Sequence, residues 1–65
     1  MEVFCFPKPA DVTWVVRCES HRDIEFGSYE DAIKKAKELG KSISADLIVF
    51  ERHNSVPRRY PAGTY

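Results

Sequence analysis

The sequence predicts a single α+β domain in the order β-β-β-α-β-β, with one helix packed on one face of a four- or five-stranded antiparallel sheet. Two observations predict it. Short segments rich in β-branched and aromatic residues lie on both sides of the middle of the chain. The stretch between them repeats apolar residues at helical spacing. The 65 residues are enough for one domain, and we expect residues 61–65 to form a loose tail.

Three strands are expected before the helix. The first, Glu2–Phe6, should end at Pro7 and Pro9, because proline has no N–H to donate to a neighbouring strand. The second is Val12–Glu19, where alternation puts its tryptophan, its central valine and its cysteine on the core face. The third, Asp23–Phe26, alternates acidic and apolar residues, which is typical of a strand with one buried face.

The helix is predicted to begin after Ser28. This residue is a good N-cap, and Asp31 three positions later completes a variant of the capping box. Gly40 and the serines that follow it weaken the end of the helix. The apolar stripe expected to face the sheet consists of Tyr29, Ala32, Ile33, Ala36, Leu39 and Ile43.

Two more strands are expected after the helix, Asp46–Arg52 and Val56–Tyr60. A short turn containing Asn54, which tolerates a positive φ, would join them. Pro57 would be tolerated only in an edge strand, so the last strand should lie at the edge of the sheet.

The stretch Leu47–Phe50 places four large apolar side chains in a row. Successive side chains of a strand point to opposite faces, so two of them must point away from the helix. The sequence leaves open whether this outward pair is Ile48 and Phe50 or Leu47 and Val49.

An apolar patch gathered from several strands favours protein–protein association. We therefore expect a non-enzymatic protein-binding module, either a homodimer or a small regulator or inhibitor that docks on a larger protein. Its contact candidates are Phe4, Phe6, Val15, Ile48 and Phe50. In the alternative interpretation, the loop around Pro7 and Pro9 and the C-terminal tail cover this face, with Tyr60 or Tyr65 as the lid.

The second expectation for function is a nucleic-acid-binding accessory protein. Arg52, Arg58, Arg59 and Tyr60 gather around the last predicted hairpin, and arginine with an aromatic ring can hold a phosphate and stack a base. The formal net charge of zero counts against this alternative, because such proteins usually carry a basic excess.

Other functional classes have weaker support in the sequence. Cys5, Cys18, His21 and His53 offer ligand atoms for zinc, but their spacing matches no four-ligand pattern, so no metal and no cofactor are expected. A domain this small leaves little room for a substrate pocket, and no apolar run is long enough to span a membrane. Two free cysteines and the absence of a signal-peptide pattern indicate a cytoplasmic protein. The profile is typical of accessory proteins of phages or mobile elements.

Four stretches resemble small bacterial domains catalogued as domain of unknown function 2188. They are "WVVR" (Trp14–Arg17), "GSYEDAIKKAKELG" (Gly27–Gly40), "ADLIVFER" (Ala45–Arg52) and "HNSV" (His53–Val56). The resemblance implies the same element order but no activity, and the chain departs from the family at Pro57 and at the His53–Asn54 turn. The helix segment Ser28–Glu38 also resembles that of HicB-type antitoxins.

Overall fold

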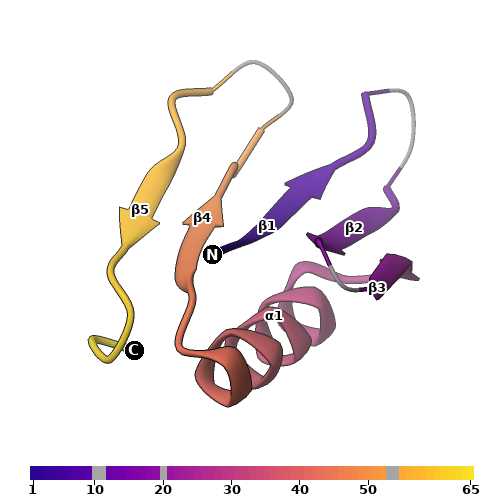
Figure 1. Cartoon of the computed structure of the whole chain (residues 1–65). Helices are drawn as coiled ribbons and strands as arrows, with labels where there is room; N and C mark the ends of the chain where they lie inside the picture. The colour runs from indigo at the N-terminus through magenta and orange to yellow at the C-terminus, as the bar shows by residue number, and fades with distance from the viewer. Residues whose placement is uncertain (10–11, 20, 53–54) are drawn as a thin grey trace.

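The computed structural model describes residues 1–9, 12–19, 21–52 and 55–65. Figure 1 shows one helix lying against one face of a five-stranded sheet. This arrangement confirms the α+β class and the predicted element order. The elements are β1 (Glu2–Pro7), β2 (Trp14–Cys18), β3 (His21–Phe26), α1 (Tyr29–Ile43), β4 (Asp46–Val49) and β5 (Arg58–Tyr60), and the sheet order is β3-β2-β1-β4-β5.

The sheet is mixed, so the prediction of an antiparallel sheet is wrong for one strand pair. β1 and β4 run parallel, whereas the other three pairs are antiparallel. The cause lies in the chain path. The hairpins β1–β2 and β2–β3 leave two edge strands that run in the same direction, and α1 reverses the chain once before β4 begins. A fourth strand added to either edge is therefore parallel to it.

Element limits differ modestly from the expected ones. β1 includes Pro7, β3 begins earlier, at His21, and β4 ends earlier, at Val49. The ladder between β2 and β3 shifts by one residue between Val16 and Cys18, which is a β-bulge. The turn predicted at Asn54 lies outside the described residues.

The helix begins where the sequence predicts. The Ser28 side chain accepts a hydrogen bond from the Asp31 backbone N–H, so Ser28 is the N-cap. At the other end, Ser44 adopts the left-handed conformation and ends the helix. The backbone N–H of this cap donates to the Gly40 carbonyl. Within the described residues, no helix is long and apolar enough to cross a membrane.

The core lies between α1 and one face of the sheet. Leu47 and Val49 point into it, which leaves Ile48 and Phe50 on the other face and settles the alternation that the sequence left open. Ala32 and Ala36 are fully buried, and their small side chains allow α1 to approach the sheet closely. The other buried members are Val3, Cys5, Val16, Cys18 and Ala45.

The C-terminal tail is fixed to the fold, which corrects the expectation of a loose tail. The Tyr65 hydroxyl donates to the Ala45 carbonyl at 2.5 Å, and the Ala62 N–H donates to the Asp46 carboxylate at 2.9 Å. Tyr65 packs against the core beside Gly40, on the helix side of the sheet. It therefore cannot act as a lid over the opposite face.

Replacing Gly40 should reveal how Tyr65 is seated. Alanine normally stabilises a helix by about 0.5–1 kcal/mol relative to glycine. At Gly40, however, an added Cβ would lie 2.0 Å from the Tyr65 hydroxyl. We expect Gly40→Ala to lower the free energy of unfolding, measured in urea, by roughly 1–2 kcal/mol. In a Tyr65→Ala background the same change should raise it. Equal effects in both backgrounds would contradict this packing.

The buried thiol of Cys5 provides a second test of the core. Burial raises its pKa from 9.0 to about 11. Between these values an unfolded chain loses the proton and the folded chain keeps it, so stability is fully present below pH 9 and falls above it. Between pH 9 and about pH 11, we expect the folding constant of the wild type to fall relative to that of Cys5→Ala by about tenfold per pH unit. Urea titrations at three pH values measure it, and a constant difference would argue against burial of the thiol.

Candidate functional site

The face of the sheet opposite α1, called the open face here, carries the candidate site. β1 contributes Phe4 and Phe6, which alternate with the buried Val3 and Cys5 on the helix side. Pairing registers place Arg17 and Ile48 on either side of Phe4. Three adjacent strands therefore bring their outward side chains into one area at the centre of the sheet.

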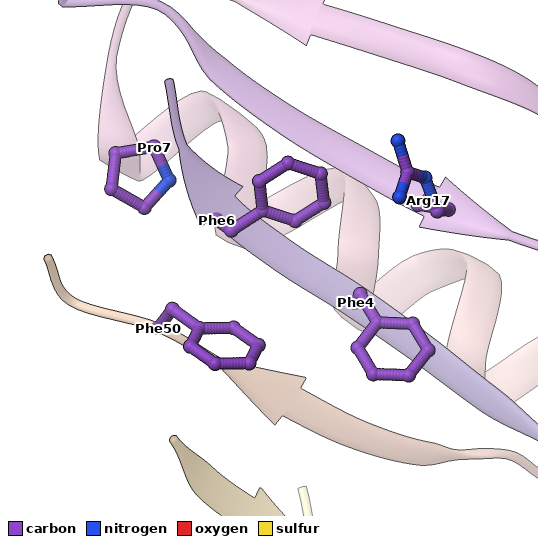
Figure 2. Close-up of a pocket in the computed structure, with 5 residues that line it drawn as sticks. All are labelled: Phe4, Phe6, Pro7, Arg17 and Phe50. Carbon is purple, nitrogen blue, oxygen red and sulfur yellow. The ribbon is translucent and has the colours of Figure 1, made fainter. Parts of the chain in front are cut away.

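Three phenylalanine rings dominate this area. Phe4, Phe6 and Phe50 are each partly buried, and together with Pro7 and Arg17 they line an open hollow of about 360 Å³. Figure 2 shows the rings above β1 and the end of β4, with Arg17 beside them on the neighbouring strand. We call this feature the aromatic hollow. Its walls are apolar and rigid, and a partner's large side chain could fill it.

All five contact candidates lie on the open face, but they are not equally available. Val15 and Ile48 are only 3% and 6% exposed. They form the floor of the face and can offer little contact area. Of the five candidates, only the three phenylalanine residues expose a substantial part of their side chains, which residue type alone could not show.

Arg17 connects the hollow to its rim. Its guanidinium lies 5.1 Å from the centre of the Phe6 ring, within the range of a cation–π contact. Two hydrogen bonds, of 3.0 and 2.8 Å, hold it to the Asp23 carboxylate and lower the pKa of Asp23. These contacts within the chain therefore hold the arginine in one orientation beside the hollow.

Ion pairs surround the apolar centre on three sides. Each cation of this rim meets a carboxylate of the same chain, so the described rim has little uncompensated charge. Exposed pairs of this kind add little stability, but they limit which charges a partner can satisfy. The pairs are Lys8 with Glu25 at 2.9 Å, Arg17 with Asp23 at 2.8 Å, and Arg59 with both Glu2 and Asp46.

The candidates for nucleic-acid binding are not brought together on one face. Arg59 pairs with Ile48 in the ladder and points to the open face, whereas Arg58 and Tyr60 pair with Val49 and Leu47 on the helix side. Arg59 is already bound to two carboxylates, and Arg58 lies 3.5 Å from the carboxylate of Glu51. Arg52 lies in the connection that follows β4.

The zinc-ligand types are also dispersed. Cys5 and Cys18 are buried free thiols on the helix side. Across the described ranges, no group of three or more potential ligands could hold a metal ion. His53 lies outside these ranges.

Comparisons with known protein families, with curated proteins and with solved structures find no match for this chain. The two family resemblances stay predictions.

A pair of neighbouring substitutions tests the assignment of faces. We expect Phe4→Ser to lower the free energy of unfolding by about 1 kcal/mol, because the ring is partly solvated, and Val3→Ser to lower it by roughly 2–4 kcal/mol, because it buries a hydroxyl in the core. Urea unfolding followed by Trp14 fluorescence measures both. A larger loss for Phe4→Ser would show that the faces are reversed.

Proposed function

We propose that this chain is a non-enzymatic protein-binding module that docks through the open face, either on a second copy of itself or as a small regulator of a larger protein. The observation that carries the proposal is the cluster of three phenylalanine rings around the aromatic hollow. Exposed single apolar residues are common, but a cluster drawn from β1 and the end of β4 needs an explanation.

The layout of the open face supports this proposal. Protein interfaces typically have an apolar, aromatic centre and a polar rim. The aromatic hollow supplies such a centre, and the three groups of ion pairs supply such a rim. The rim is nearly neutral, which favours a partner without strong charge, including another copy of the same face.

The two edges of the sheet support docking by the face rather than by strand addition. β5 has only three residues and is flanked by Pro57 and Pro61, neither of which can donate a hydrogen bond to an added strand. β3 carries exposed charges and pairs with β2 through a bulge. Proline, charge and bulges are the usual protections of an edge strand.

The size of the face limits the affinity to be expected. Five strands at a spacing of about 4.8 Å and a length of about 18 Å give a face of roughly 400 Å² on each partner. The two partners together would bury roughly 800–1,000 Å², at the low end for specific complexes. Docking through this face alone should therefore be weak or transient.

The alternative function, nucleic-acid binding through the last hairpin, has weaker support. Its three arginines and Tyr60 are divided between two faces, and two of the arginines already contact carboxylates. No described contact favours it over protein binding.

Site-specific photo-crosslinking in the organism that makes the protein tests the proposal. A benzoyl-phenylalanine at position 6, beside the aromatic hollow, should yield a crosslinked species. The same group at Lys34, on the solvent side of α1, is the matched control. A crosslinked product with twice the mass of the chain would identify a homodimer. A product of any other mass would identify a different protein as the partner. Crosslinks from position 34 alone, or loss of the position 6 product on nuclease treatment, would contradict docking through the open face.

A further inference from the structure

A second surface lies on the helix side of the sheet, between α1 and β5. The backbone of the helix lies close to β1, β2, β3 and β4 but farther from the described part of β5. Figure 1 shows β5 at the edge of the sheet, beyond the helix. Side chains from α1, β4, β5 and the tail border a trough there, and no described helix or strand covers it.

Aromatic side chains line this trough along its length. We call it the tyrosine trough, because Tyr29, Tyr60 and Tyr65 all border it. Tyr29 and Tyr60 are 40% and 37% exposed and are the most exposed aromatic residues described. Rigid amphipathic rings of this kind are typical of peptide-binding surfaces.

The trough consists of two hollows that share Tyr29. One, of about 280 Å³, lies between Tyr29, Tyr60 and Tyr65, with Ile33 and Leu47 among its lining residues. The other, of about 270 Å³, is bordered by Trp14, Tyr29 and Glu51. The Trp14 and Tyr29 rings meet edge to face with their centres 4.9 Å apart, which fixes Tyr29 as a ridge between the hollows.

We propose that the tyrosine trough binds an extended proline-containing peptide segment that carries a carboxylate. Polyproline II helices have no internal hydrogen bonds, so their carbonyls are free to accept from the hydroxyls of Tyr29 and Tyr60. The proline rings of such a peptide fit between aromatic ridges. The peptide loses little conformational entropy on binding, because it is already extended. The Tyr29 hydroxyl is protonated at neutral pH and can donate, and desolvation raises its pKa further.

The charge of the larger hollow selects the carboxylate. Among the described residues that line it, Lys37 is the one with a charged side chain, and none has an acidic side chain. At the other end of the trough, the positive Arg58 is compensated by Glu51. A ligand would therefore be oriented with its acidic residue beside Lys37 and its prolines toward Tyr29.

This site does not depend on the open face, because the two surfaces lie on opposite sides of the sheet. Single substitutions can therefore change one surface without changing the other. Tyr60→Ala and Lys37→Glu change the trough, whereas Phe4→Ser changes the open face. Lys37 and Tyr60 are both exposed, so neither change removes a core residue.

Trp14 provides the readout, because it is the single tryptophan of the chain and borders the trough. Three blocked peptides serve as probes: five prolines followed by glutamate, five prolines followed by lysine, and a glycine–serine peptide ending in glutamate. We expect saturable changes in Trp14 emission with the first, and about tenfold weaker binding with the second. The third should give no saturable change.

The variants complete the test. Tyr60→Ala should weaken binding of the proline–glutamate peptide about tenfold, a loss typical of an aromatic contact residue. Lys37→Glu should reverse the preference between glutamate and lysine, and Phe4→Ser should change neither. The inference is overturned if no peptide binds at millimolar concentration, if the glycine–serine peptide binds equally well, or if Phe4→Ser rather than Tyr60→Ala abolishes binding.

Discussion

The alternation of side chains along β1 is the constraint on which the rest of the structure depends. β1 is the central strand and is hydrogen-bonded to β2 on one side and to β4 on the other. Its Val3 and Cys5 are fully buried under α1, and its Phe4 and Phe6 form the middle of the open face. A shift of one residue in its register would exchange core and surface.

The parallel pairing of β1 with β4 joins the two ends of the chain and builds the aromatic hollow. The Phe50 N–H donates to the Cys5 carbonyl at 2.9 Å, and the Asp46 N–H donates to the Met1 carbonyl at 3.1 Å. These bonds bring Phe50 beside Phe6, although more than half of the chain separates them. The hollow thus forms only when the last strands dock, so folding and the candidate site are coupled.

Sequence patterns predicted the features that depend on near neighbours. The Ser28 cap and most of the helix stripe follow from spacing within a few residues, whereas Tyr29, which was expected in the stripe, is 40% exposed. The alternation of Leu47–Phe50 did not follow, because it is set by a pairing with β1 far away in the sequence. The docking of Tyr65 was missed for the same reason. Gly40 could have indicated it, because a glycine inside a helix is unfavourable and here leaves the space for the Tyr65 ring. The parallel direction of β4 could have been deduced, since both edges of a three-stranded meander run the same way.

The described fold has five strands but one helix, which explains why the open face and the tyrosine trough both stay uncovered. The helix lies against β1, β2, β3 and β4 but does not reach β5, so one helix leaves part of its own side of the sheet uncovered. The tail compensates in part, because Tyr65 fills the space between the end of α1 and β4. The remainder, from Tyr60 to Trp14, stays open because β5 extends the sheet beyond the helix. The open face has no covering layer of secondary structure among the described residues, and three partly buried phenylalanine rings line its hollow. A partner that occupied either surface would supply the layer that 65 residues are too few to provide.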